Sequence, residues 1–303
     1  MQIHSLLKQY RSNHPASKPA RILFHGVADK DVYNITAPFN VDKKTYLFGR
    51  VESRDSEFSQ ACLFEEKENE YYLVEEFPHF DMQDPFITFI QDEIVLGGVV
   101  INESKTDPNV LEWRTDFFKG TTLDSLEKFF EGPKGMKDIR LKELSDNRIL
   151  VLTRPQGEKG GRGKIGATII DSLKSLTIDL VEDAPLLNHQ FTDEEWGGAN
   201  EIHLIDQDTV GVLGHIASFD DEGNRHYYAL SFRLDLNDFS INSPKIIAER
   251  RDFLEGPSKR DDLIDVVFSG GILQLGNAAE LYCGISDAET QKIMIENPFM
   301  KEG

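Results

Sequence analysis

Five short polar side chains each begin an apolar, strand-like segment, and they are the first candidates for chemistry: Asn34, Asp84, Asp138, Asn200 and Asp265. If the fold brings these segments together, the three carboxyl groups are crowded. Crowding raises the pKa of at least one of them towards that of a general acid. Asp84 differs from the others because Pro85 follows it and stiffens the backbone. The alternative is that these side chains only bond loop amides and hold the strands in register.

A second candidate is the basic, glycine-rich stretch TRPQGEKGGRGKIG at residues 153–166. Glycines let backbone amides approach an anion, and guanidinium groups grip phosphate oxygens in pairs. Two further loops, GPKGMKD (132–138) and GPSKRDD (256–262), repeat a Gly-Pro-x-Lys pattern. Together these loops predict a phosphate site, and its candidate ligands are Arg154, Arg162, Lys164, Lys137 and Lys259. The alternative is a flexible basic surface hairpin.

The segment RVESRDSE (50–57) alternates positive and negative side chains. Arg50, Glu52 and Asp55 could form the rim of a sugar site, because such side chains make the paired hydrogen bonds that hydroxyl groups need. A salt-bridged loop is the alternative. His215 is a further candidate polar ligand, but no HxH, HExxH or Cys/His cluster has the spacing of metal ligands. We therefore expect no metal.

The elements that must position these residues are strands. The five leading residues are 50 to 65 positions apart, and each precedes an apolar strand, a polar turn and a second apolar strand. This period suits one four-stranded antiparallel sheet plus loops, so the chain is predicted to be an all-β, five-bladed β-propeller. We expect residues 21–303 to form this single domain and residues 1–20 to be an extension packed on it. Helical periodicity is confined to residues 2–10, 123–130 and 287–295, of which the last could equally be an edge strand.

Propeller topology predicts where the candidates meet. In each blade the start of the innermost strand, the end of the second strand and the loop that enters the next blade lie on the same face. The basic loops and the five leading residues should therefore surround one opening of the central axis, where ligand sites form.

Composition excludes several classes of function. The formal net charge is −20 and the pI is about 4.8, which argues against nucleic acid and anionic membrane surfaces as partners. No apolar run is long enough to span a bilayer, and the first 20 residues lack a secretory h-region. Cys62 and Cys283 are interpreted as free thiols, which favours a cytoplasmic location. The sequence does not predict the oligomeric state.

A longer series of motifs carries a family resemblance: VYNITAPF, FGRVESRDSE, QDPF, FFEGPKGMKDIRL, TRPQGEKGGRGKIG, EEWGGANE, GVLGHIASFD, DLIDVVFSGGI and LYCGISDAE. The chain resembles, over about residues 20 to 300, a family once labelled only as a domain of unknown function. Its members are β-1,2-mannoside phosphorylases and dual mannosyltransferase-phosphorylases, related to propeller glycoside hydrolases and phosphorylases.

The resemblance implies inverting phosphorolysis of a β-1,2-linked mannoside to mannose 1-phosphate, or the reverse synthesis or transfer. Asp84 in QDPF would be the single catalytic acid, and inorganic phosphate would be the co-substrate, with no other cofactor. The implied sugar ligands are Asn34, Arg50, Glu52, Asp55, Asp138, Asn200, Glu201, His215 and Asp265. A hydrolase that uses water and a non-catalytic carbohydrate-binding propeller remain as alternatives.

Overall fold

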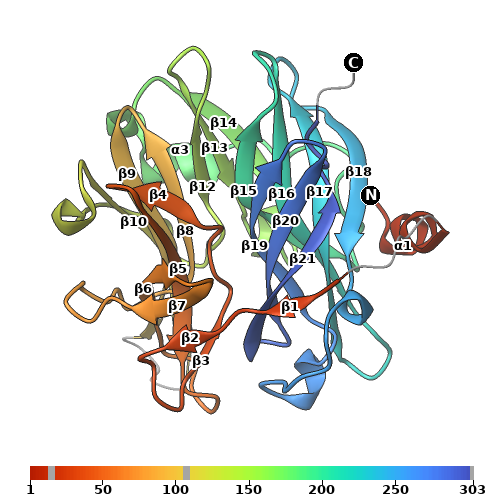
Figure 1. Cartoon of the computed structure of the whole chain (residues 1–303). Coiled ribbons are helices and arrows are strands. Elements are labelled where there is room, and N and C mark those ends of the chain that lie inside the picture. Colours follow the sequence, from red (N-terminus) through yellow and green to blue (C-terminus); the bar gives the residue numbers. More distant parts are fainter. Residues whose placement is uncertain (13–17, 105–109, 301–303) are drawn as a thin grey trace.

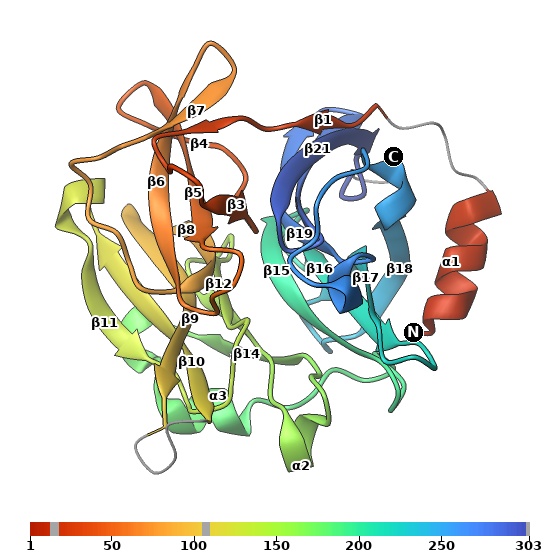
Figure 2. The ribbon, with the colours of Figure 1, turned by 90° about the horizontal axis from the view of Figure 1, so that it is seen from below.

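The computed structural model describes residues 1–12, 18–104 and 110–300. Five antiparallel sheets surround one axis (Figures 1 and 2), so the predicted five-bladed β-propeller is confirmed. Most of the sheets have the four-stranded form. The third has three strands, and the short helix α3 (Ile178–Asp183) lies beyond them in the sequence.

The blades follow one another along the chain. Blade 1 contains β3 (Asp31–Tyr33), β4 (Phe39–Val41), β5 (Lys44–Glu52), β6 (Ser59–Lys67), β7 (Glu70–Leu73) and, parallel to β7, β2 (Phe24–His25). Blade 2 contains β8 (Gln83–Ile90), β9 (Glu93–Glu103), β10 (Leu111–Gly120) and β11 (Glu127–Glu131). Blade 3 contains β12 (Arg140–Glu143), β13 (Ile149–Thr153) and β14 (Gly166–Ile170). Blade 4 contains β15 (Trp196–Leu204), β16 (Thr209–Phe219), β17 (Arg225–Asp235) and β18 (Ile241–Ala248).

Blade 5 joins the two ends of the chain. It contains β19 (Val267–Leu275), β20 (Ala278–Ile285), β21 (Glu289–Glu296) and, on the outer edge of β21, β1 (Ala20–Arg21). Figure 2 shows β1 reaching from the side of blade 1 to β21. Pairing between segments from opposite ends of the chain closes the ring and covers an edge that would otherwise be open.

Helices are few and short. Helix α1 (Ile3–Ser12) lies outside β18 (Figure 2) and inserts Ile3 and Leu6 into the core. Helix α2 (Gly157–Gly160) lies in the basic loop. Single 3₁₀ turns cover η1 (Leu123–Ser125), η2 (Leu173–Ser175), η3 (Arg250–Asp252) and η4 (Asp261–Leu263). Among the described residues, no helix is long and apolar enough to cross a membrane.

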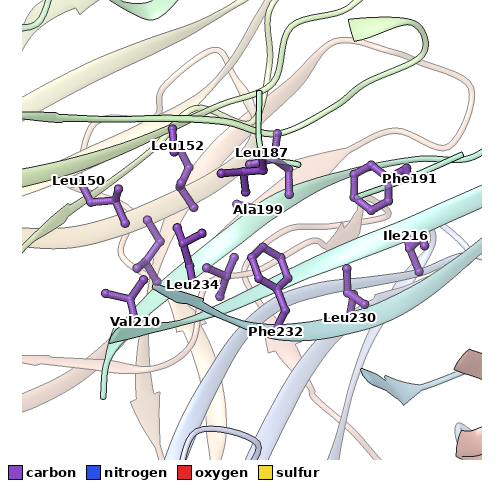
Figure 3. Close-up of a cluster of buried hydrophobic side chains, with 14 of the residues drawn as sticks. Leu150, Leu152, Leu187, Phe191, Ala199, Val210, Ile216, Leu230, Phe232 and Leu234 are labelled. Atoms are coloured by element: carbon purple, nitrogen blue, oxygen red, sulfur yellow. The ribbon is translucent and has the colours of Figure 1, made fainter. Parts of the chain in front are cut away.

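The core consists of apolar layers between neighbouring blades. Figure 3 shows Leu150 and Leu152 of blade 3 in one cluster with Val210, Leu230 and Phe232 of blade 4. Each blade packs against a neighbouring blade on both faces of its sheet. Side chains on both faces of a central strand such as β13 (ILVLT) are therefore buried along its whole length. This packing fixes the angle between blades, and with it the position of the residues at the axis.

Candidate active site

A cavity of about 180 Å³ lies where all five blades meet. Its lining residues include Asn34 and Arg50 of blade 1, Asp84 of blade 2, Lys137, Asp138 and Arg154 of blade 3, His215 of blade 4, and Phe268 and Asp287 of blade 5. Contributions from every blade place this cavity on the ring axis. Seven residues chosen from the sequence are thereby brought together: Asn34, Arg50, Asp84, Lys137, Asp138, Arg154 and His215.

The inner strands present these side chains through backbone irregularities. Asn34, Asp84 and Asp138 have φ values of 47°, 49° and 59°, in the left-handed region that Asn and Asp tolerate better than most residues. Asp84 lies in a bulge of β8, where the register shifts between Gln83 and Phe86. Bulges re-aim side chains next to ligand sites. Strained backbone thus turns three polar side chains towards the axis.

The fifth leading residue, Asp265, does not occupy the position in its blade that Asp84 occupies in blade 2. The corresponding irregularity of β19 lies between Ser269 and Gly271, so the position belongs to Gly270 and not to Asp265. A Cβ at Gly270 would lie 1.8 Å from the carbonyl oxygen of Ile35, which excludes any side chain. Asp265 does not line the axial cavity among the described residues, and its carboxylate bonds His226.

Asp84 is held through one oxygen. Its Oδ1 accepts hydrogen bonds from Asn34 Nδ2 at 2.7 Å and from Arg50 at 3.1 Å. Arg50 also bonds Glu52 at 2.7 Å, so its guanidinium group is fixed from two sides. The orientation of the carboxyl group is therefore set by these contacts to Oδ1.

Arg154 and Asp138 form a loose buried pair in the same cavity. One guanidinium nitrogen of Arg154 lies 3.4 Å from Asp138, while its Nε donates to the carbonyl of Gly197 at 2.6 Å. The buried atoms Nη1 of Arg154 and Oδ1 of Asp138 have no hydrogen-bond partner among the described residues. Burial opposes ionisation of Asp138, but the guanidinium groups of Arg154 and Arg140 outweigh it and lower its pKa. Asp138 is therefore an anion at neutral pH. Nη1 of Arg154 contacts Oδ2 of Asp138 as an ion pair at 3.4 Å, so the hydrogen-bonding capacity of this nitrogen and of Oδ1 of Asp138 is unused in the described structure.

Glycines shape this site by leaving room for Arg154. A Cβ at Gly163, where φ is +145°, would lie 2.5 Å from a guanidinium nitrogen of Arg154. A Cβ at Gly198 would lie 2.8 Å from its Cδ. The loop glycines were expected to expose backbone amides to an anion. At Gly163 the structure gives a steric reason for glycine, because a larger residue would clash with the side chain of Arg154.

His215 is a neutral acceptor. Asn200 donates to the carbonyl and hydroxyl oxygens of Ser269 at 2.6 and 3.1 Å, so its Oδ1 is the acceptor for His215 Nδ1 at 3.0 Å. Burial lowers the pKa of His215 to about 3, with Asp138 opposing and Arg154 reinforcing the shift. The proton therefore resides on Nδ1, and Nε2 carries a lone pair. Asn200 therefore holds the imidazole ring of His215 and is not itself among the described lining residues of the axial cavity.

Sequence reasoning missed several lining residues. Asp287, in the middle of the β20–β21 turn, has φ of 51°, and burial raises its pKa, with Arg50 opposing and Asp84 reinforcing the shift. Arg225 and Arg260 also line the cavity, and both bond Asp262. Arg260 was noticed only as part of a basic loop, whereas Asp287 and Arg225 lie in ordinary turn and strand sequences that carry no local signal.

The cavity is cationic for so acidic a chain. Its described lining contains five Lys or Arg side chains and four carboxylates, whereas the whole chain has a net charge of −20. Lys137 has no ion-pair partner among the described residues. This balance favours an anionic ligand. In the described parts of the chain, no three His, Cys, Asp or Glu side chains gather as metal ligands.

Other predicted residues stand behind the cavity or on its rim. Glu52 is buried and bonds Tyr33, Arg50 and Lys259, so it supports Arg50. The ammonium group of Lys259 is occupied by Glu52 and by the carbonyl of Ser56 at 2.6 Å. Asp55 is exposed in the same loop.

The remaining candidates are more distant from the described lining. Arg162 lies over the rings of Phe219 and Trp196, at 4.8 and 5.7 Å. Lys164 lies 3.4 Å from Asp193. Glu201 bonds His203 and the amide of Ile272 and lines a different pocket, of about 130 Å³.

Comparison with known proteins agrees with this architecture. The family described as "Protein of unknown function (DUF1861)" matches residues 8–301. No curated protein matches the chain. The mannose phosphorylase MPT-4 of Leishmania mexicana, solved with a phosphate ion, is 31% identical over 98% of this chain and 93% of its own, with a TM-score of 0.90.

Two further structures extend the comparison. The GDP-Man-dependent mannosyltransferase MPT-1 of Leishmania mexicana is 30% identical over 100% of this chain and 97% of its own, with a TM-score of 0.90. A β-1,2-mannobiose phosphorylase from Listeria innocua shares the fold at 14% identity and a TM-score of 0.64, over 94% of this chain and 92% of its own. The resemblance drawn from the motifs is confirmed. This protein is a member of the DUF1861 family and a homologue of the Leishmania mannose phosphorylase and mannosyltransferase.

Proposed function

We propose that this protein is an inverting phosphorylase of β-1,2-linked mannosides, which releases mannose 1-phosphate or runs in reverse. A phosphate oxygen attacks the anomeric carbon on the face opposite the glycosidic oxygen. The bond from that carbon to the glycosidic oxygen breaks, and the departing oxygen takes up a proton. One acid and one anion site suffice, so the second carboxylate required for hydrolysis is not needed.

Asp84 is the proposed proton donor. Its Oδ1 is engaged by Asn34 and Arg50, which leaves Oδ2 to carry the proton to the glycosidic oxygen, directly or through a sugar hydroxyl. Asp138 is unsuitable for this role because nearby guanidinium groups lower its pKa.

Arg154 and Lys137 are the proposed phosphate ligands. Nη1 of Arg154 is buried without a hydrogen-bond partner, and Lys137 has no ion-pair partner among the described residues. Arg162 and Lys164 remain proposed as outer cations that attract the anion, because their described contacts lie on the rim. Lys259 is proposed to act indirectly, by holding Glu52.

The proposed sugar ligands are the other polar groups of the cavity. Asn34, Arg50, Asp138 and Asp287 line it, and Nε2 of His215 is free to accept from a hydroxyl group. Glu52 and Asn200 support Arg50 and His215 from behind. We retain Asp55, Glu201 and Asp265 only as residues that could contact a longer ligand outside the axial cavity.

The observation that carries the proposal is that Asp84 and Arg154 line one cationic cavity on the ring axis. The test is incubation with mannose 1-phosphate and mannose, followed by measurement of released phosphate and of the linkage in the product. A β-1,2-linked disaccharide is expected. Failure to release phosphate with mannose or any mannoside acceptor would contradict the proposal.

Three controls separate the neighbouring functions. Cleavage of β-1,2-mannobiose at the same rate without phosphate would indicate a hydrolase. Mannose transfer from GDP-mannose would indicate a transferase such as MPT-1. Sugar binding without turnover, unchanged by Asp84→Asn, would indicate a non-catalytic binding propeller.

The proposed setting is the cytoplasm, with inorganic phosphate as co-substrate and no metal or organic cofactor. The structure describes Cys62 and Cys283 as buried free thiols, and burial raises the pKa of the Cys62 thiol to about 12. Such thiols persist unmodified in a reducing compartment.

A further inference from the structure

A second cavity lies beside the axial one, between blades 1 and 2. Its volume is about 540 Å³, which is within the range of ligand sites, whereas the axial cavity of about 180 Å³ is below it. We call it the blade 1–2 cavity and define it by Ser53, Phe58, Gln60, Asp81, Gln83 and Asn102. No step of the proposed reaction uses it.

The two cavities adjoin at Gln83. This side chain lines both of them, and its amide donates to the carbonyl of Glu57 at 2.7 Å. Glu57 lines the axial cavity and its neighbour Phe58 lines the blade 1–2 cavity. Asp84 follows Gln83 directly. A ligand that reacts at Asp84 and is longer than the axial cavity therefore has an adjoining space to enter.

The loop between the cavities is braced. Ser56 accepts from the amide of Phe58 at 2.9 Å, Gln83 holds Glu57, and Arg260 pairs with Glu57 at 2.9 Å. Phe58 is nevertheless 54% exposed. Phe58 thus contributes a largely exposed aromatic ring to the cavity lining from a braced loop, and such a ring is a platform for the apolar face of a sugar ring.

The charges favour a neutral ligand. The described lining has one cation, Lys30, and two carboxylates, Glu52 and Asp81, so it lacks the excess of positive charge that a diphosphate would need. The rest of the described lining combines five amide or hydroxyl side chains with six apolar ones, and Gln60 and Asp81 form a hydrogen-bonded pair at 3.2 Å. Such groups match sugar hydroxyls.

We infer that the blade 1–2 cavity binds the non-reacting units of a mannoside chain while the terminal unit reacts at Asp84, so that longer chains are preferred. This inference rests on the proposed function for the identity of the sugar. The pocket at Glu201 shares no lining residue with the axial cavity among those described, which leaves the blade 1–2 cavity as the adjoining site.

The test compares β-1,2-mannobiose with β-1,2-mannotetraose. We expect Phe58→Ala to lower the ratio of kcat/KM for the tetrasaccharide to that for the disaccharide by about fivefold, because an aromatic contact contributes about 1 kcal/mol. Leu275→Ala is the control. Leu275 is 51% exposed and lines none of the three cavities described above, so its loss should leave the ratio unchanged. Asn102→Ala should repeat the effect of Phe58→Ala.

Calorimetric titration with mannotetraose and with GDP distinguishes the outcomes. Tighter binding of the tetrasaccharide than of mannobiose, weakened by Phe58→Ala, supports the inference even if no phosphorolysis occurs. Phosphorolysis with a chain-length ratio unaffected by Phe58→Ala overturns the inference and leaves the proposed function intact. Binding of GDP that Phe58→Ala abolishes would also overturn it, because the cavity would then serve a nucleotide.

Discussion

Replacing Asp84 by Asn separates proton donation from every other property of this side chain. The amide retains an Oδ1 that can accept from Asn34 and Arg50, and it has nearly the same shape as the carboxyl group. What is lost is the transferable proton on Oδ2. General acid catalysis contributes about 10²- to 10⁴-fold, so we expect phosphate release from mannose 1-phosphate and mannose to fall by about 10³-fold.

The accompanying loss of stability should be small. Removing one partner of a buried ion pair destabilises by about 3–5 kcal/mol when the other charge is left alone. Arg50 is not left alone, because Glu52 bonds it at 2.7 and 3.2 Å. We therefore expect the free energy of unfolding in urea to fall by about 1 kcal/mol, far too little to explain a 10³-fold loss of activity.

A control variant and a control substrate test whether the loss of activity is specific to proton donation by Asp84. Asp265→Asn changes a carboxyl group outside the described cavity lining and should leave activity within about twofold. A substrate with a good leaving group, such as 4-nitrophenyl β-mannoside, needs little protonation, so Asp84→Asn should lose much less activity on it. If the folded Asp84→Asn variant turns over mannose 1-phosphate within threefold of the wild type, Asp84 is not the acid.

Three further perturbations test the surroundings of the acid. Gly163→Ala places a Cβ 2.5 Å from the guanidinium group of Arg154, so the KM for phosphate should rise about tenfold, whereas Gly161→Ala, at φ of +58° with nothing within 4 Å, should leave it unchanged. Equal KM values for the two variants would argue against a phosphate role for Arg154. Because burial lowers the pKa of His215 to about 3, the unfolded chain binds a proton near pH 6.5 that the folded chain does not; stability should therefore fall as pH decreases from 6.5 towards 3, by up to about 1.4 kcal/mol per pH unit. The slope should be shallower for His215→Gln in urea unfolding at pH 7, 6 and 5, and identical slopes would contradict a buried neutral imidazole. Glu52→Gln removes the carboxylate that Arg50 and Lys259 share, while Asp84 still bonds Arg50 and Glu57 still pairs with Lys259; the free energy of unfolding should therefore fall by about 2 kcal/mol, whereas a loss below 1 kcal/mol would mean that Glu52 does not brace Arg50.

The repeated strand pattern was sufficient to predict the propeller, because every blade repeats a similar register of apolar residues. Asn34, Asp84 and Asp138 could be selected from the sequence because Asn and Asp tolerate left-handed backbone positions better than most residues. In blade 5 the corresponding irregularity lies at Gly270, whose proximity to the backbone of Ile35 cannot be seen in the local sequence.

Other errors have the same origin in tertiary context. Residues 123–130 have helical periodicity, yet they form the turn η1 and the edge strand β11, because pairing with β10 outweighs the local preference. Residues 287–295, whose pattern fitted either a helix or an edge strand, fall largely in strand β21. Asp287 and Arg225 enter the cavity through ring closure, which no short motif encodes.

Because β1 completes blade 5, we expect the axial cavity to form late in folding. Its walls come from segments as far apart as Asn34 and Asp287, and the last sheet incorporates residues from both chain ends. Partly assembled rings can contain most of the strands but cannot bring Asp84, Arg154 and Asp287 around one ligand. During refolding, recovery of ligand binding should therefore lag behind recovery of the β-sheet circular dichroism signal. Ligand binding at the axial cavity would then report that the five-bladed ring has closed.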